Sequence, residues 1–200
     1  KLASEELCKH YGKDFGIEFR VGRFHNIYGP QGTWKGGREK APAAFCRKAK
    51  CSTAETGMEM WGDGLQTRSF CYIDDCVEGV LRLFASDFRE PLNIGSDEMV
   101  SMIDMGTMAL EYAGKKDTVV IRHVPGPEGV RGRNSDNTLI KETLGWTPSI
   151  SLKEGIGRTF KWISAQLDEE AAKGVDITAT YACSHVVVNR TPEDSMSKTK

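Results

Sequence analysis

The sequence has no long hydrophobic run and no excess of charge of one sign. Its 200 residues carry 27 Lys and Arg against 28 Asp and Glu, a formal net charge of −1. No stretch approaches the 18 or so uninterrupted apolar residues of a membrane-spanning helix, and the first residues lack the apolar core of a signal peptide. Nucleic-acid binding needs a basic face, which near-neutral charge does not favour. We therefore predict a soluble chain with no membrane and no nucleic-acid partner, in a cytoplasmic setting by default.

The sequence also lacks a compact cysteine framework of the kind found in small secreted proteins. In a reducing compartment its cysteines are expected to stay thiols. Two pairs share the spacing C-x4-C, which lies at the edge of what zinc ligands use, and His10 or His25 could add to them. Both pairs fall in segments with continuing secondary-structure patterns, so we predict no metal site. The six cysteines are Cys8, Cys46, Cys51, Cys71, Cys76 and Cys183.

What the sequence does have is a local concentration of positive charge in residues 23–48. Glu39 is the only acid in this stretch, and Gly32, Gly36 and Gly37 keep the backbone small and pliable. Such a loop suits a bound phosphate or pyrophosphate. The alternative is a solvated loop with ordinary surface lysines. The cations are Arg23, Lys35, Arg38, Lys40, Arg47 and Lys48.

Hydrophobic periodicity predicts an α/β fold. Helices are expected over residues 1–11, ended by Gly12, and over 41–50, with Pro42 in the first turn. Strand alternation is expected over 16–24, and two short strands should flank the turn at 62–64. Because no initiating Met and no cap precede Lys1, we expect the sequence to enter in the middle of a helix of a longer chain.

The second half continues with alternating elements. Asp74 or Asp75 should cap a helix whose apolar stripe is predicted to be core. Ser101 should cap a helix over 101–113 whose Met102, Met105 and Met108 are predicted to be core, with a binding surface as the alternative. Strands are expected at 91–95 and 118–124, and Ser151 with Glu154 forms a capping box for the last long helix. Residues 178–188 are expected to add one strand. The stripe residues are Val77, Val80, Leu81 and Phe84.

Several motifs together resemble a known family. They are a Lys at the head of a helix, R-x-x-N-x-Y-G-P at 23–30, W-G-D-G-x-Q-T-R-S-F at 61–70, Asp74 with Gly79, and Arg133 with Asp136. This set is similar to the extended short-chain dehydrogenases/reductases that act on nucleotide sugars. Residues 32–49 and 125–137 most resemble the branch that inverts C3 and C5 of GDP-mannose, and the similarity runs from residue 1 to about 188.

The resemblance implies an enzyme with tightly held NAD that oxidises GDP-D-mannose at C4, inverts C3 and C5 beside the ketone, and reduces C4 again. The product would be GDP-L-galactose, on the route to ascorbate. Lys1 would be catalytic and cofactor-binding, holding the nicotinamide ribose and lowering the pKa of a tyrosine that this sequence lacks. The Gly-rich dinucleotide loop and a catalytic cysteine are also missing. We therefore expect an incomplete fragment that is inactive alone and whose full-length form is a homodimer.

The same resemblance assigns Lys40 as an acid/base that works beside the ketone. Neighbouring cations at Lys35, Arg38 and Lys48 should lower its pKa toward neutrality if they lie close in space; alternatively Lys40 only pairs with a phosphate or with Glu39. The positions that match substrate contacts are Asn26, Glu39, Lys40, Ala41, Lys48, Gln66, Thr67, Arg68, Arg133 and Ser184.

Some of these residues have a chemical rationale and a structural alternative. Arg68 and Arg133 can grip a pyrophosphate with forked donors, and Arg131 could join them. Arg133 could instead form a salt bridge with Asp136, and Asn26 could only fix the turn that follows it.

The predicted fold class is the C-terminal part of a Rossmann-like parallel sheet interwoven with a small α+β substrate lobe. Residues 1–30 and 69–95 would belong to the NAD-binding sheet, 31–68 and 96–188 to the lobe, and 189–200 to a disordered tail. Two other functions stay open. One is a nucleotide-sugar 4-epimerase or 4,6-dehydratase; the other is a non-enzymatic nucleotide-sugar- or zinc-binding module.

Overall fold

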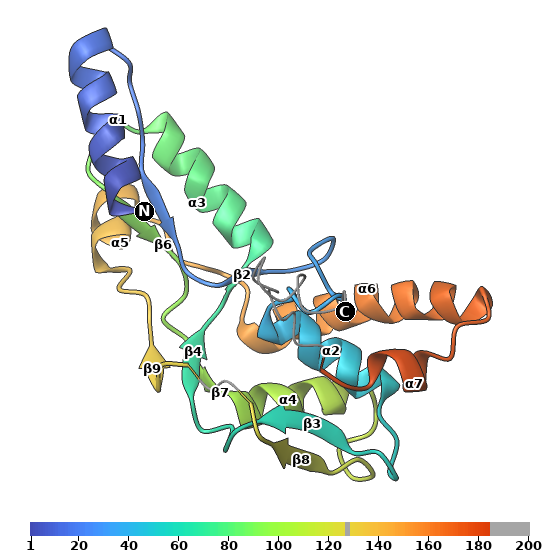
Figure 1. Cartoon of the computed structure of the whole chain (residues 1–200). Helices are drawn as coiled ribbons and strands as arrows, with labels where there is room; N and C mark the ends of the chain where they lie inside the picture. The colour runs from blue at the N-terminus through green and yellow to red at the C-terminus, as the bar shows by residue number, and fades with distance from the viewer. Residues whose placement is uncertain (127–128, 185–200) are drawn as a thin grey trace, which may run out of the picture.

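The chain folds into a mixed α/β structure in which parallel strand pairing predominates. The computed structural model describes residues 1–126 and 129–184 (Figure 1), so the tail predicted over 189–200 lies outside the described residues. Four strand pairs are parallel, β1–β6, β2–β5, β3–β8 and β4–β9, and one pair, β4–β7, is antiparallel. The predicted α/β class is confirmed. Among the described helices, none combines the length and the apolar character needed to cross a membrane.

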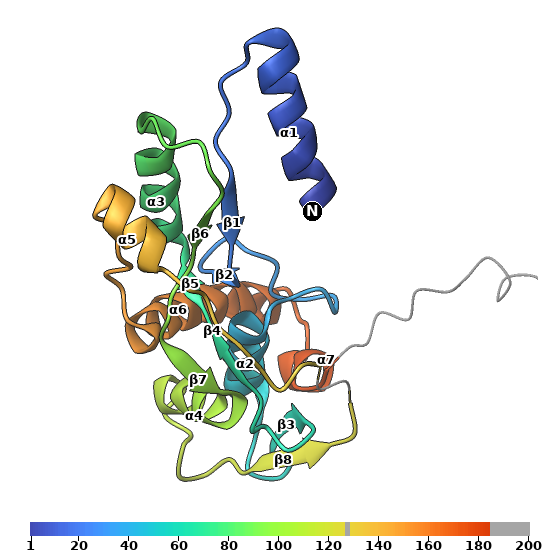
Figure 2. The same cartoon turned by 90° about the vertical axis from the view of Figure 1, so that its left-hand side faces the viewer.

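Helix α1 (Leu2–Phe15) is longer than predicted. It continues through Gly12 and ends at Gly16, whose φ of 64° is the left-handed conformation typical of a helix C-terminus. The strand that follows is correspondingly short, because β1 (Gly22–Phe24) pairs only with the three residues of β6 (Leu92–Ile94). Helix α1 buries none of its own residues and lies at one end of the molecule, beyond β1 (Figure 2).

A small cluster of buried side chains lies where β6, β5 (Cys71–Tyr72), α3 (Ile73–Ala85) and α5 (Thr138–Leu144) meet. Strand β2 (Ile27–Tyr28) pairs in parallel with β5 and leads the chain from β1 toward the cavity described below. Trp146 fills the centre of this cluster and is 1% exposed. The other members are Cys71, Cys76, Leu83, Leu92, Ile94 and Ile140.

Helix α3 packs on a different face from the one predicted. The stripe expected to be core is exposed, with Phe84 78% and Leu81 61% accessible to solvent. The buried face instead contains Gly79 and Leu83, and a Cβ at Gly79 would lie 3.0 Å from Ile94. The missing side chain therefore lets the helix approach β6 closely, which fixes the buried face.

Asp75 does not cap α3 as predicted. Tyr72 occupies the N-cap position, and the buried Asp75 carboxylate accepts hydrogen bonds from the Ser149 backbone N–H and Oγ, both at 2.9 Å, and from the Ile150 N–H at 3.0 Å. Asp75 thus joins the start of α3 to the chain entering α6 (Leu152–Ala172).

The larger core forms where α2 (Ala41–Cys51) packs against α4 (Met102–Tyr112) and α6 (Figure 1). Pro42 lies in the first turn of α2, as predicted. Met105 is fully buried here, which agrees with the predicted role of the methionines as core. The Ser151 hydroxyl accepts a hydrogen bond from the Glu154 N–H, so the Ser151 half of the predicted capping box is present, whereas the Glu154 carboxylate accepts from Arg158.

Strands β3 (Met58–Trp61) and β4 (Thr67–Ser69) flank the turn at 62–64 as predicted, but they belong to different sheets. β3 pairs with β8 (Ile121–Val124), whereas β4 lies between β7 (Met99–Ser101) and β9 (Gly132–Arg133). The turn therefore carries the chain from one sheet to another. This arrangement places Arg68 beside Arg133 in register.

The strand predicted over 178–188 is wrong for its described part. Residues Ile177–Tyr181 form the short helix α7, whose start is capped by the Asp176 carboxylate accepting from the Ala179 N–H. Residues 185–188 lie outside the described part of the chain.

Candidate functional site

A cavity of about 320 Å³ lies between α2, β3 and β4. Residues from six separate stretches line it, and most of the predicted substrate-contacting positions are among them. The predicted residues that line the cavity are Asn26, Glu39, Lys40, Ala41, Lys48, Gln66, Arg68 and Ser184. The fold thus brings together side chains that the sequence separates by up to 158 positions.

Lys40 lies at the N-terminus of α2. It is the N-cap residue, in an extended conformation with φ −74° and ψ 157°, and no acidic residue lies in the first turn of the helix. The positive end of the helix dipole and the unpaired N–H groups of the first turn therefore face the side of the cavity where Lys40 lies. This is a suitable place for an anionic group of a ligand.

Lys48 is the most perturbed cation of the cavity. It is 5% exposed, its Nζ donates to the Glu59 carbonyl oxygen at 3.0 Å, and its ammonium group lies 5.9 Å from the centre of the Trp61 ring. Burial, and secondarily the charge of Arg47, lowers the pKa of Lys48 to about 8. A diphosphate in the cavity would stabilise the protonated form of this lysine.

Arg47 lines the cavity, but its charge is paired within the protein. It is 1% exposed and forms a salt bridge with Glu39, Nη2 to Oε1 at 2.7 Å. Its remaining donors go to backbone carbonyls, at Trp34, Tyr181 and Cys183. Arg47 and Glu39 therefore neutralise each other, although both residues line the cavity.

Arg68 and Arg133 occupy facing positions on β4 and β9. The Arg68 guanidinium donates to the Thr67 carbonyl at 2.7 Å and also to the Val130 carbonyl. Arg133 donates through Nη2 to Asn26 Oδ1 at 3.4 Å, so its side chain turns to the cavity-lining Asn26. Both arginines thus border the same edge of the cavity, with Arg68 inside its lining.

Asn26 links the two halves of the site. Its φ of 45° is a left-handed conformation that non-glycine residues seldom adopt, and its Nδ2 donates to the Ser69 carbonyl at 2.8 Å. The side chain therefore joins the β1–β2 junction to β4, in place of the alternative role of fixing the following turn. Strain of this kind concentrates at functional sites.

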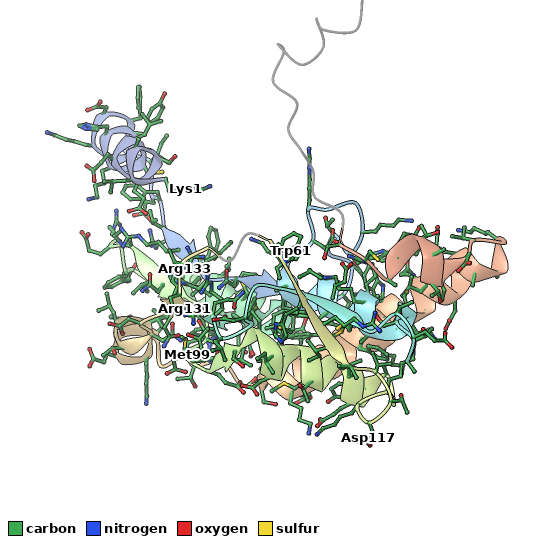
Figure 3. The ribbon with its side chains drawn as sticks, turned by 60° about the horizontal axis from the view of Figure 1, so that its bottom comes forward. Lys1, Trp61, Met99, Asp117, Arg131 and Arg133 are labelled. Carbon is green, nitrogen blue, oxygen red and sulfur yellow. The ribbon has the colours of Figure 1, made fainter. Side chains whose placement is uncertain are left out.

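Some predicted residues lie elsewhere. Lys1, Thr67 and Arg133 are not in the lining of the cavity, and Lys1 is exposed at the start of α1 (Figure 3). The predicted convergence of Arg131 on the site is wrong, because its guanidinium pairs with Asp63 at 2.7 Å.

Two cations of the predicted positive cluster also have acidic partners away from the cavity. Arg23 pairs with Glu5 at 2.6 Å, and Lys35 pairs with Glu170 at 3.4 Å. The concentration of charge seen in the sequence is therefore partly dispersed by the fold. The cavity keeps Lys40, Lys48 and Arg68 as cations without a carboxylate salt bridge among the described residues.

An apolar wall of the cavity was not predicted. Trp61 directly precedes the turn at 62–64 and Phe70 follows β4, so both lie in the motif at 61–70 and could have been inferred from it. Met102 lines the cavity from α4, which agrees with the binding-surface alternative for the methionine stripe. The remaining apolar side chains of this wall include Phe45 and Met60.

The cysteine pairs do not form a metal centre in the described part of the chain. No group of three or more His, Cys, Asp or Glu side chains in residues 1–126 and 129–184 is placed to hold a metal ion. Burial raises the pKa of Cys51 to about 11 and that of Cys71 to about 12, which favours the thiol over the thiolate that a metal requires.

Cations, amides and a hydroxyl line a cavity beside parallel strands, which places the chain in the class of α/β proteins with a polar ligand site at the edge of a parallel sheet. The model of the NAD dependent epimerase/dehydratase family matches residues 1–95. The chain is 68% identical over 192 residues, 96% of its length, to GDP-mannose 3,5-epimerase of Arabidopsis thaliana. Residues 1–95 of the chain therefore belong to the NAD dependent epimerase/dehydratase family, and the resemblance found in the sequence is confirmed.

Solved structures agree with this family. UDP-glucose 4-epimerase of Thermotoga maritima, solved with UDP-glucose, matches with a TM-score of 0.72 and 27% identity over 84% of this chain and 52% of its own. UDP-glucuronic acid 4-epimerase of Bacillus cereus, solved with UDP-glucuronic acid and NAD, matches with a TM-score of 0.70 and 26% identity over 83% of this chain and 51% of its own. The chain spans about half the length of the curated relatives it matches, 50% for the Arabidopsis protein.

Proposed function

We propose that the complete protein epimerises GDP-D-mannose at C3 and C5 to GDP-L-galactose through a 4-keto sugar. The observation that carries this proposal is the cavity itself, which is lined by Lys40 at the N-terminus of α2, Lys48 in its last turn and Arg68 on β4. It is supported by the 68% identity to a GDP-mannose 3,5-epimerase, which extends over 96% of the chain. Its product would feed ascorbate biosynthesis, as the resemblance implies.

In this mechanism the side chains of the cavity have three tasks. Lys48, Arg68 and Arg133 bind the diphosphate together with the first turn of α2, because cations and unpaired N–H groups both stabilise phosphate oxygens. Asn26 and Gln66 bind sugar hydroxyls, with Glu39, Ala41, Thr67 and Ser184 as further substrate positions. Lys40 acts as an acid/base in proton transfer at the carbons beside the ketone, since it lies next to the anion site at the N-terminus of α2.

The NAD of this family would supply the oxidation and re-reduction at C4. This chain provides only part of the binding site for such a cofactor. Lys1, at the exposed start of α1, is the residue that would hold its ribose, and the 200 residues contain no Gly-rich turn for its pyrophosphate. We therefore expect no epimerisation by a polypeptide of these residues alone.

We also propose the division into two lobes that the sequence suggested. Residues 1–30 and 69–95 would belong to the NAD-binding sheet, and 31–68 and 96–188 to the substrate lobe. The two separate clusters of buried side chains support this division, although α5 packs on β6 and so crosses it. Since α1 buries none of its own residues, it is available for the homodimer of the complete protein.

Replacing Lys40 by Ala in the complete protein tests the proposed chemistry. In D₂O the unchanged enzyme should exchange the hydrogens at C3 and C5 of GDP-mannose, and Lys40→Ala should lower that exchange by about 100-fold or more. The matched control is Lys153→Ala, which removes an exposed lysine outside the cavity and should leave exchange unchanged. A 4-epimerase or 4,6-dehydratase activity that survives Lys40→Ala at full rate would refute the proposal.

A further inference from the structure

We propose that Arg47 is a positioning residue that holds two walls of the cavity in place, the loop that ends at Lys40 and the segment that ends at Ser184. The inference rests on the proposed function, because it explains how the acid/base and a substrate contact are held. Arg47 itself lines the cavity, but its charge is paired with Glu39.

The first wall is the loop of residues 34–39. Arg47 Nη2 donates to Glu39 Oε1 at 2.7 Å, and Arg47 Nε donates to the Trp34 carbonyl at 3.1 Å. The other oxygen of Glu39 accepts from the Gly37 N–H at 2.8 Å, so the loop is tied at its beginning, middle and end. Lys40 follows directly, and its position depends on this anchorage.

The second wall is the segment after α7. Arg47 Nη1 donates to the Cys183 carbonyl at 3.0 Å and to the Tyr181 carbonyl, which otherwise have few partners at the end of a helix. On its other side, Ser184 donates its backbone N–H to Glu59 Oε2 at 3.0 Å. The segment is therefore fastened to α2 and to β3, and closes the cavity between them.

Only an arginine can make this set of bonds. Its planar guanidinium carries five N–H donors that point in fixed and different directions, whereas a lysine ammonium donates from one atom. Nε, Nη1 and Nη2 of Arg47 each serve a different part of the two walls. Since the Arg47–Glu39 pair is buried and neutral overall, its effect on a bound diphosphate is geometric.

The test uses the 200-residue chain and two variants. Arg47→Lys keeps the positive charge and removes the separate donors of the guanidinium. The double variant Arg47→Met with Glu39→Gln removes both charges and leaves no unpaired carboxylate. The matched control is Lys115→Met, because Lys115 is another partly buried cation that donates to backbone carbonyls, those of Lys50 and Ser52, at the far end of α2. Amide hydrogen exchange of residues 35–40 and 181–184 is measured first, without ligand. Acylation of the Lys40 amine, with and without GDP, is then followed by mass spectrometry.

Both Arg47 variants should exchange at least about tenfold faster in both segments, and GDP should no longer slow acylation of Lys40. Lys115→Met should keep both properties, even where its overall stability falls. Unchanged exchange in either segment of Arg47→Lys would overturn the inference. If GDP fails to slow acylation in the unmodified chain, the proposed function fails instead, and the exchange measured without ligand still decides the role of Arg47.

Discussion

Replacing Lys48 by Met should make the isolated chain more stable at neutral pH. Burial among Phe45 and Trp61 lowers the pKa of Lys48 from its ordinary value to about 8. A shift of this size corresponds to about 3 kcal/mol of unfavourable free energy for the charged form at pH 7. The substitution also removes the hydrogen bond to the Glu59 carbonyl, worth about 1 kcal/mol, and the contacts with the rings. We therefore expect a net gain of about 1 to 2 kcal/mol in the free energy of unfolding.

The pH dependence gives a more specific test of the same reasoning. Because the folded-state pKa of Lys48 is below its unfolded value, the unfolded chain binds more protons between about pH 8 and pH 10.5. The stability of the unmodified chain should therefore rise relative to the variant across this interval. The advantage of Lys48→Met, full below pH 8, should shrink as pH increases and change sign before about pH 10.5, because the variant still lacks the hydrogen bond to the Glu59 carbonyl once Lys48 is neutral.

Urea unfolding followed by tryptophan fluorescence, at half-unit steps from pH 7 to pH 10.5, measures both effects. The difference between variant and unmodified chain isolates Lys48 from other groups that titrate in this range. Lys153→Met is the matched control, because the Lys153 side chain is 65% exposed and should change stability by less than about 0.5 kcal/mol. A loss of stability in Lys48→Met at pH 7, or a difference that does not depend on pH, would refute the reasoning.

Three further predictions concern the fold and can be checked by the same urea unfolding. Asp75→Ala should cost about 2 to 4 kcal/mol, since it leaves buried donors without an acceptor, whereas the exposed Asp74→Ala should cost less than about 0.5. Met105→Ala should cost about 2 to 5 kcal/mol in the larger core, and Met99→Ala, 41% exposed, far less; equal losses would contradict the packing of α4. Phe84→Ser should change stability by under about 0.5 kcal/mol, and a large loss would mean that this face of α3 is covered.

Local signals in the sequence predicted much of the secondary structure. Pro42 located the start of α2, and the pairing of Ser151 with Glu154 located the start of α6. Such signals work because caps and first turns depend on a few neighbouring residues. The carboxyl end of α1 was misplaced because two glycines, Gly12 and Gly16, were equally suitable, and only Gly16 adopts a left-handed φ.

Packing was harder to predict because periodicity shows an apolar stripe without showing what covers it. In α3 the stripe of Leu81 and Phe84 is exposed, while Gly79, which carries no side chain, makes the closest approach to β6. Strand pairing had the same difficulty. The turn at 62–64 has the composition of a hairpin, yet β3 and β4 pair with strands far along the chain.

The site was predictable as a set of residues but not as a set of contacts. The resemblance grouped Lys40, Lys48 and Arg68, and the fold places all three around one cavity. Charge alone could not separate Arg47 from Lys48, which are adjacent in the sequence. Arg47 finds its acceptors at Tyr181 and Cys183, and no local pattern links residues so far apart.

The distance along the chain between Arg47 and those acceptors has a consequence for biosynthesis. The acceptors are translated 134 and 136 residues after the arginine itself. A growing polypeptide that has already formed α2 can pair this guanidinium with Trp34 and Glu39, but its Nη1 group lacks its acceptors until Tyr181 and Cys183 leave the ribosome. Closure of the pocket is then among the final events of folding, and a ribosome that stops before residue 181 releases a protein with an open pocket.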